Sequence, residues 1–217
     1  GPSAPGAQTA VRRVRDTGTG IPAEEILRLA QDTWRGIDSL TDRINYLPVD
    51  HVDLRAGAKG GPTGHVADYA NVTTIGFYLM SVVAAHDLGI LSPESTLVRL
   101  RGVLQTLTRL ERRNGFFYNY YDTTSLERTS NFISFVDSAW LAAGLIVTRQ
   151  AFPELRTRVD RFLRDFDFSF FYDPAVGLMS HGYYVHTGVR SQFHYGVLYA
   201  EARMGSLIAI GLGQVPE

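Results

Sequence analysis

Residues 72–88 read VTTIGFYLMSVVAAHDL, and this stretch decides the class of fold. Apolar side chains occupy nearly every side of the helix that the stretch predicts, not a single stripe. A helix that is apolar all round is typical of a buried position. Gly89 follows directly and is expected to end the helix. The stretch therefore predicts a helix buried inside a helical protein.

Working outward, two more mostly apolar helices are expected at residues 134–152 and 194–212. Amphipathic helices are expected between and before them, at residues 22–45, 93–113 and 153–166. Ser92 and Pro93 form a typical helix start, and Ile26 to Ile44 supply one apolar stripe in the first helix. Alternating amphipathic and apolar helices are typical of helical hairpins with outer and inner members. We predict an all-α fold, half or whole of an (α/α)6 toroid.

Three long loops, residues 47–71, 116–133 and 167–193, each precede one of the apolar helices. Connections in compact domains are usually about 4–6 residues long, and much longer ones often carry function. Because the loops all lead into inner helices, we expect them at one end of the fold. The candidate site is predicted at that end.

Composition narrows the function further. The chain has 217 residues, a formal net charge of -1 and no cysteine, which argues against nucleic acid as the main partner and excludes thiolate chemistry. The six histidines show no compact metal spacing, so neither a metal nor another cofactor is expected. Residues 1–20 are interpreted as a protease-cleavage remnant, Gly1-Pro2, followed by a flexible linker, and residues 21–217 as the domain.

Glu201 is the most informative single position, because it is a carboxylate inside the apolar stretch 194–212. Burial would raise the pKa of such a group and suit it to act as a general acid. The structural alternative is an ion pair with Arg203 that ties helices together.

Asp137 stands near the start of another apolar helix, in FVDSAW, residues 135–140. It is a candidate ligand-binding carboxylate at the loop end. The alternative is a capping or helix-dipole role at the start of that helix.

The loops interleave aromatic rings with hydrogen-bonding side chains. Flat rings contact the C–H faces of sugars, and Asp, Asn, His and Arg bind the hydroxyls. The alternative for any one ring is that it packs the loop onto the helices. The candidate aromatic and histidine positions are Tyr118, Tyr120, Tyr183, His194 and Tyr195. His194 and Tyr195 could also serve as the acid and base of a polysaccharide lyase.

A series of segments in order resembles the bacterial glucoamylase-like family, whose relatives include endo-β-1,2-glucanases of glycoside hydrolase family 144 and the glucoamylase-like domain of cyclic β-1,2-glucan synthases. The segments are LPVD (47–50), YANVTTIGFYL (69–79), AAHDLG (84–89), LTRLER (107–112), GFFYNYYD (115–122), VDS (136–138), FSFFYD (168–173), HYG (194–196) and EAR (201–203).

The resemblance implies an (α/α)6 toroid that acts on a β-glucan. It implies that Glu201 is the general acid and that Asp137 lines the same pocket. It also implies sugar-binding roles for Asp50, Tyr118 and Asp122. With the loop aromatics above and Arg203, these are the predicted site residues.

The family domain is about twice as long as this chain, so the six predicted helices correspond to its first half. We expect a second chain or a C-terminal segment to complete the toroid and to cover an apolar face. The predicted function is a glycoside hydrolase or transglycosylase that acts on a β-glucan, with the β-1,2-linked glucan as the expected substrate. The alternatives are a non-catalytic carbohydrate-binding or scaffold half-toroid and a polysaccharide lyase. The expected location is extracellular or periplasmic, with the cytoplasm as the alternative.

Overall fold

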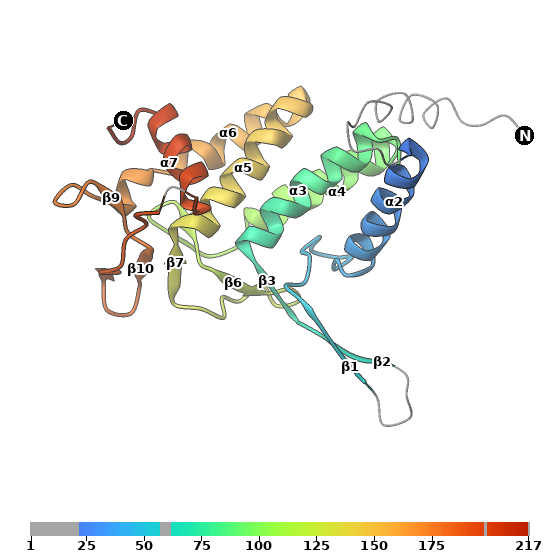
Figure 1. Cartoon of the computed structure of the whole chain (residues 1–217), viewed down its shortest axis with the longest axis horizontal. Helices are drawn as coiled ribbons and strands as arrows, with labels where there is room; N and C mark the ends of the chain where they lie inside the picture. Colours follow the sequence, from blue (N-terminus) through green and yellow to red (C-terminus); the bar gives the residue numbers. More distant parts are fainter. Residues whose placement is uncertain (1–21, 57–61, 198, 217) are drawn as a thin grey trace, which may run out of the picture.

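The computed structural model describes residues 22–56, 62–197 and 199–216. The described part contains six α-helices. They are α2 (Ala23–Ser39), α3 (Val72–Asp87), α4 (Pro93–Leu107), α5 (Phe135–Ala151), α6 (Arg156–Asp165) and α7 (Ala202–Gly211). Two short 3₁₀-helices, Pro153–Leu155 and Phe168–Phe171, flank α6. In Figure 1 the face toward the viewer is formed by α3, α5 and α7.

The three apolar helices pack side by side, as the sequence predicts for inner helices. Between α3 and α5 the backbones almost touch: a Cβ added at Gly76 would lie 2.3 Å from the carbonyl oxygen of Trp140, and one at Gly144 would lie 2.4 Å from that of Gly76. Between α5 and α7, Gly205 lies against Phe135 and Ala139 in the same way. Glycine at these positions therefore sets the spacing of the inner row.

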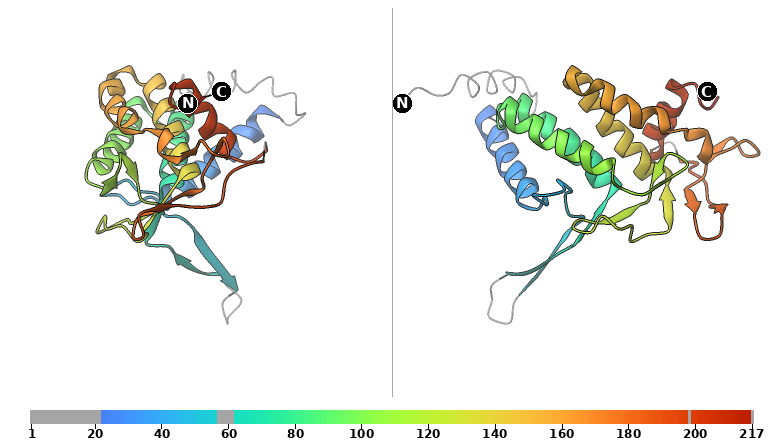
Figure 2. Two further views of the ribbon diagram at one scale, coloured as in Figure 1. Left: turned by 90° about the vertical axis from the view of Figure 1, so that its left-hand side faces the viewer. Right: turned by 180° about the vertical axis from the view of Figure 1, so that it is seen from behind.

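The amphipathic helices α4 and α6 lie behind this row, as Figure 2 shows from the opposite side. Ser92 caps α4 by accepting a hydrogen bond from the Ser95 N–H, with Pro93 at the first helical position. The helix α2 lies at the edge, where Trp34 is buried and stacks on Tyr78 of α3. The three mostly apolar helices thus form one row, with the amphipathic α4 and α6 behind it and α2 at its edge.

Short strands occupy the long loops, so the prediction of an all-α fold is wrong in this respect. The longest pair is the hairpin of β1 (Val52–Ala56) and β2 (Pro62–Val66), which projects from the body in Figure 1. The others are β3 (Tyr69–Asn71), β4 (Arg112–Arg113), β5 (Phe116–Phe117), β6 (Tyr120–Asp122), β7 (Phe132–Ser134), β8 (Tyr172–Asp173), β9 (Leu178–Met179), β10 (Gly182–Tyr184) and β11 (Val189–Arg190).

All pairings in these small sheets are antiparallel. The strands β3 and β6 form one pair, and the order β11-β10-β7 forms a three-stranded sheet. Figure 1 shows that these elements gather at the end where α3 and α5 begin. The prediction that the long loops share one end is confirmed.

Two helices end earlier than their apolar spacing predicts. The first ends at Ser39 and not near Asn45, because the Asp42 carboxylate accepts the backbone N–H groups of Ile44 and Asn45 and turns the chain. As a result Ile44 is 82% exposed and does not continue the apolar stripe.

The third predicted helix ends at Leu107 and not at Arg113. Beyond it, β4 and β5 form a hairpin around Asn114 and Gly115, whose φ angles are 51° and 81°. Positive φ at both central residues defines the tight turn for which Asn-Gly is the typical sequence. The dipeptide is thus a hairpin signal and not a helix stop.

The last predicted helix starts later than expected. Its first residues have a strand-like course, because the Tyr195 N–H bonds to the Met179 carbonyl and His194 bridges to Ser180. The helix α7 therefore begins only at Ala202, and Glu201 is its N-cap residue, not a residue of the helix interior.

Candidate functional site

Asp137 lies in the first turn of α5 and is held by two side chains from different elements. One carboxylate oxygen accepts the Thr73 hydroxyl of α3 at 2.6 Å, and the other accepts the Asn119 amide at 3.1 Å. Its backbone N–H bonds to Ser134, the N-cap of α5. Ser134, and not Asp137, therefore caps α5, and the Asp137 carboxylate is fixed in the first turn, where the helix dipole favours it. Each oxygen keeps a further lone pair for a ligand.

Asn119 organises this corner of the molecule. Its backbone carbonyl accepts the N–H of Val72, the first residue of α3, and its side-chain oxygen accepts the N–H of Ser134. Its amide reaches Asp137. One loop residue therefore fixes the beginnings of α3 and α5 relative to each other, in a way that the sequence pattern did not reveal.

Glu201 is exposed, so the expectation of a carboxylate buried in the middle of an apolar helix is wrong. The reason is the late start of α7, which leaves residue 201 at the helix end. No ion pair joins it to Arg203 among the described residues, and Arg203 is also exposed, in the first turn of α7. The Glu201 carboxylate instead accepts the indole N–H of Trp140 at 3.0 Å.

Tyr195 links the two carboxylates electrostatically. Burial, followed by the negative charges of Glu201 and Asp137, raises the pKa of the Tyr195 phenol to about 12. The Tyr195 phenol is therefore within electrostatic range of both carboxylates, near the starts of α5 and α7. At neutral pH the phenol is a hydrogen-bond donor and acceptor and is far from acting as a base.

Trp140 and Thr73 are the residues of this site that sequence reasoning did not select. Thr73 and Phe77 lie four residues apart on α3, and Asp137 and Trp140 lie three apart on α5. Residues at these spacings share a helix face, so the two helices present two facing pairs. The Phe77 and Trp140 rings stack with centroids 4.6 Å apart. The three-residue spacing between Asp137 and Trp140 is the sequence feature that could have identified Trp140 as a residue of this site.

A second cluster contains Asp50 and Tyr120. Asp50 lies 3.1 Å from the His51 ring nitrogen, and the Tyr69 ring meets both His51 and Tyr120 edge to face. The register of β3 against β6 places Tyr120 opposite Asn71, next to Asn119. This cluster is therefore connected to the Asp137 corner through one loop.

The sugar-binding roles of Tyr118 and Asp122 stay predictions: Tyr118 is buried and Asp122 is partly exposed. Tyr118 is 2% exposed and Arg128 covers its ring at 4.4 Å. The Asp122 carboxylate accepts the backbone N–H groups of Thr124 and Ser125, which lowers its pKa. Both residues hold the loop in place.

Tyr183 and His194 lie in the third loop region. The Tyr183 ring packs on Phe170 with a centroid distance of 4.9 Å. His194 pairs with Asp173 at 3.0 Å, and this contact, after the Ala175 N–H, lowers the pKa of the Asp173 carboxyl. His194 is thus engaged with Asp173, and the phenol of its neighbour Tyr195 feels the charges of Glu201 and Asp137.

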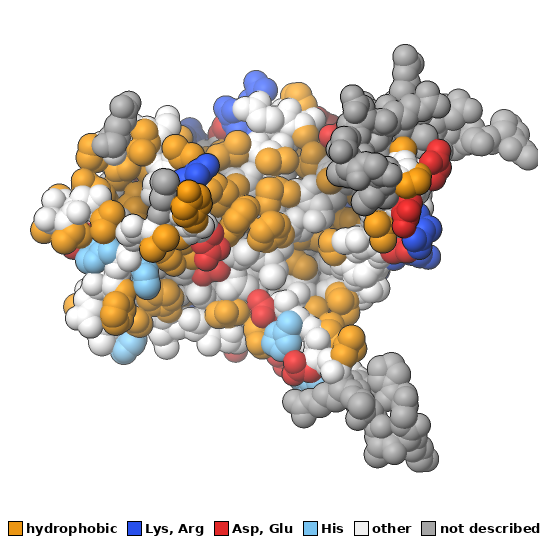
Figure 3. Space-filling model, in the orientation of Figure 1, with side chains coloured by type: hydrophobic (Ala, Val, Ile, Leu, Met, Phe, Trp, Pro, Cys, Tyr) orange, Lys and Arg blue, Asp and Glu red, His pale blue; other side chains and the backbone are white. Residues whose placement is uncertain are grey.

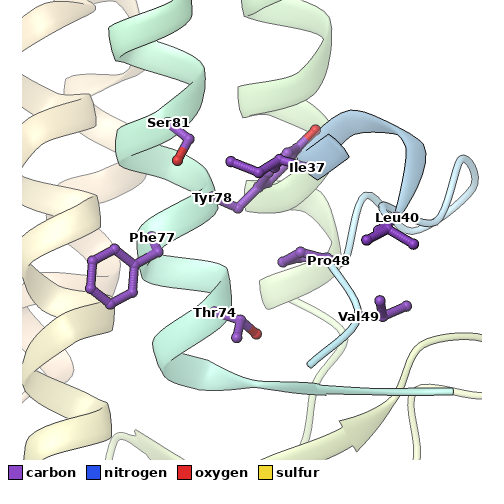
Figure 4. A pocket seen from close by; sticks show the side chains of 8 residues that line it. All are labelled: Ile37, Leu40, Pro48, Val49, Thr74, Phe77, Tyr78 and Ser81. Atoms are coloured by element: carbon purple, nitrogen blue, oxygen red, sulfur yellow. The ribbon is translucent and has the colours of Figure 1, made fainter. Parts of the chain in front are cut away.

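Hydrophobic side chains cover much of the face formed by α3, α5 and α7, with acidic groups among them (Figure 3). A separate apolar hollow of about 230 Å³ lies between α2 and α3, lined by the eight side chains of Figure 4. In that view Phe77 points away from the other seven, toward α5.

The described residues hold neither a metal-binding cluster nor a membrane-spanning helix. No group of three or more His, Asp or Glu side chains is arranged to hold a metal ion there. None of the helices that the structure describes has the length and apolarity needed to cross a membrane.

Comparison with known proteins places the fold. The chain is 34% identical over 125 residues to the cyclic beta-(1,2)-glucan synthase NdvB of Rhizobium meliloti (strain 1021), an alignment covering 57% of this chain and 4% of NdvB. An endo-beta-1,2-glucanase from Chitinophaga pinensis, in complex with sophorotriose and glucose, superimposes with a TM-score of 0.61 at 16% identity, over 76% of this chain and 41% of that one. The resemblance to the glucoamylase-like family is confirmed.

A candidate glucoamylase from Bacteroides fragilis supports the same assignment. It superimposes with a TM-score of 0.63 at 17% identity, over 80% of this chain and 43% of that chain. No family model matches the sequence. The chain spans about two fifths of these two structures and a small fraction of NdvB.

Proposed function

We propose that this chain is part of a glycoside hydrolase or transglycosylase that acts on a β-glucan, with β-1,2 linkages as the preferred substrate. The observation that carries the proposal is the Trp140–Glu201 hydrogen bond, which brings Glu201 to the first half of α5, where Asp137 lies, with both charges acting on Tyr195. The substrate class is supported by the similarity to NdvB and to the Chitinophaga endoglucanase.

In the proposed mechanism Glu201 donates a proton to the glycosidic oxygen that leaves. Its exposed position at the start of α7 makes the carboxyl accessible to a polysaccharide. Asp137 binds the sugar at the same site through the lone pairs that Thr73 and Asn119 leave open. A second carboxylate from the segment that completes the site activates water, as two-carboxylate hydrolysis requires.

The remaining sugar contacts are assigned by accessibility. Asp50, Tyr120 and Tyr183 are partly exposed and surround the loop end, and Arg203 is exposed on α7. His194 and Tyr195 lie on the segment that leads to Glu201. Tyr118 and Asp122 support these residues from beneath.

We further propose that the six helices belong to an (α/α)6 toroid completed by another chain or a C-terminal segment, in a protein that acts outside the cytoplasm. The support is the apolar inner row, on which Phe77 and Leu207 are 46% and 60% exposed. Large contiguous apolar areas are uncommon on the surfaces of monomeric proteins.

The test is the Glu201→Gln variant, assayed on a panel of β-glucans with product sizing, both in this chain and in the full-length gene product. We expect a loss of activity of roughly 10²- to 10⁴-fold, as for removal of a general acid. Glu127→Gln, at an exposed loop position, is the matched control and should retain activity. Turnover at the wild-type rate by Glu201→Gln would overturn the assignment.

The same assay separates the alternatives. A lyase would leave an unsaturated sugar that absorbs in the near ultraviolet, whereas a hydrolase would not. The raised pKa of Tyr195 is unfavourable for the base of such a lyase. A carbohydrate-binding module would bind the glucan and release no products.

A further inference from the structure

We propose that Trp140 is a positioning residue that fixes the orientation of the Glu201 carboxylate through its indole N–H. The proposal deepens the proposed function and rests on it for the catalytic consequence. The contact itself can be tested without any activity.

Apart from the Trp140 indole, few contacts orient the Glu201 carboxylate. It is exposed, stands at the N-cap of α7 and makes no side-chain capping bond to that helix. Within the described part of the chain, the 3.0 Å bond from Trp140 is the one side-chain hydrogen bond recorded for its carboxylate. A glutamate side chain on the surface samples several rotamers, so this bond selects among them.

Trp140 is itself held by contacts with α3. Its ring stacks on Phe77 at an interplanar angle of 29°. Its backbone carbonyl lies against Gly76, where the two inner helices come closest. The stack on Phe77 restrains the indole and the Gly76 contact holds its backbone, so the Phe77–Trp140–Glu201 series connects α3, α5 and the start of α7.

The chemistry of the indole N–H also suits this role. An indole N–H donates one hydrogen bond and accepts none. It therefore holds one carboxylate oxygen without competing for the proton that the acid must deliver. The other Glu201 oxygen stays available, and the Trp140 that holds the first one lies about one helical turn from Asp137 on α5.

The test uses Trp140→Phe, which keeps a flat ring on Phe77 and removes the donor. On the natural glucan, whose leaving sugar needs a proton, kcat should fall roughly 100-fold, the scale of a misplaced catalytic group. On an aryl β-glycoside with a good leaving group, which needs no such proton, kcat should change by less than about threefold. KM and the melting temperature should stay close to the wild-type values.

Trp34→Phe is the matched control, because Trp34 is the other of the two tryptophans and is buried between α2 and α3. It should show no dependence on the leaving group. Equal losses of kcat on both substrates for Trp140→Phe would indicate a general structural defect and overturn the proposal.

An activity-independent measurement separates this proposal from the proposed function. In the nitrogen-15 spectrum of the Trp34→Phe protein, the remaining indole N–H signal belongs to Trp140. Replacing Glu201 with Gln exchanges a charged acceptor for a neutral one and should shift that signal upfield in the proton dimension. An unchanged signal would overturn the contact. A shifted signal, together with a full-length wild-type protein that cleaves no glucan, would leave the contact standing and refute the proposed function.

Discussion

At the scale of single residues, the site depends on hydrogen bonds that cross between elements. Asp137 receives the Thr73 hydroxyl from α3 and the Asn119 amide from a loop. The sequence predicted the carboxylates Asp137 and Glu201 because acidic residues are conspicuous in apolar stretches. It did not predict the hydrogen-bond donors to these carboxylates. A Thr or Trp in a helical sequence does not show which residue of a neighbouring helix it will contact.

The first prediction concerns Thr73→Val, which is close to isosteric and removes the 2.6 Å bond to Asp137. A hydrogen bond to a charged, partly buried group contributes about 1.5–3 kcal/mol, so unfolding free energy should fall by that order. Urea denaturation measures it. Thr33→Val, whose exposed hydroxyl bonds only within α2, is the control and should change stability by less than about 0.5 kcal/mol. Equal effects would contradict the role of Thr73.

The second prediction concerns pH. Because the pKa of Tyr195 rises to about 12 in the folded state from an ordinary value near 10, the folded state holds this proton more tightly. The associated stability is fully present below about pH 10 and is lost as pH rises toward 12. Tyr195→Phe should therefore lose less stability than the wild type between pH 9 and 11.

Denaturation curves across that range give the slope of unfolding free energy against pH. Tyr199→Phe, at a ring that is 90% exposed, is the control. Tyr78, whose pKa burial also raises to about 12, gives both proteins a common background slope. Indistinguishable slopes for the wild type and Tyr195→Phe would show that the phenol is not coupled to folding.

At the scale of elements, hydrophobic patterning located the inner helices well. The stretch at 72–88 became α3 to within one residue, and Ser92 and Ser134 cap the helices that follow them. The misplaced ends have local causes. Asp42 captures backbone donors after α2, and Asn114-Gly115 forms a hairpin. The start of α7 depended on a long-range pairing with Met179 that no local pattern contains.

The third prediction concerns the crossing of α3 and α5. A methyl group at Gly76 would lie 2.3 Å from the Trp140 carbonyl oxygen, and backbone atoms cannot move aside cheaply. Gly76→Ala should therefore destabilise the protein by about 1–3 kcal/mol, as overpacking does. Gly36→Ala in α2 has open space around the new methyl group and should stabilise by up to about 1 kcal/mol. Thermal unfolding of both variants checks the opposite signs, and a neutral Gly76→Ala would contradict the close packing.

At the scale of the whole molecule, the apolar front face is the main unexplained surface. Leu207 on α7 is 60% exposed, and Val197 and Tyr199 just before the helix are 69% and 90% exposed. Such an area favours association with a complementary apolar surface. The proposed completion of the toroid would provide that surface.

The fourth prediction follows for the chain studied alone. It should self-associate as concentration rises, and Leu207→Gln should weaken this association without lowering the melting temperature. Sedimentation velocity at several concentrations measures it. Leu54→Gln, at a residue that is 75% exposed on the projecting β1–β2 hairpin, is the control and should have no effect. Identical association of both variants would exclude α7 from the contact.

The common orientation of the inner helices has one more consequence. Both α3 and α5 start at the strand-rich end, and Tyr195 brings the start of α7 to the same place. Each helix start carries a partial positive charge of about half an elementary unit from its aligned peptide dipoles. The backbone itself thus forms an electropositive rim around Asp137 and Glu201. This rim offsets part of the repulsion between the two carboxylates and attracts electron-rich oxygens to the place where they lie.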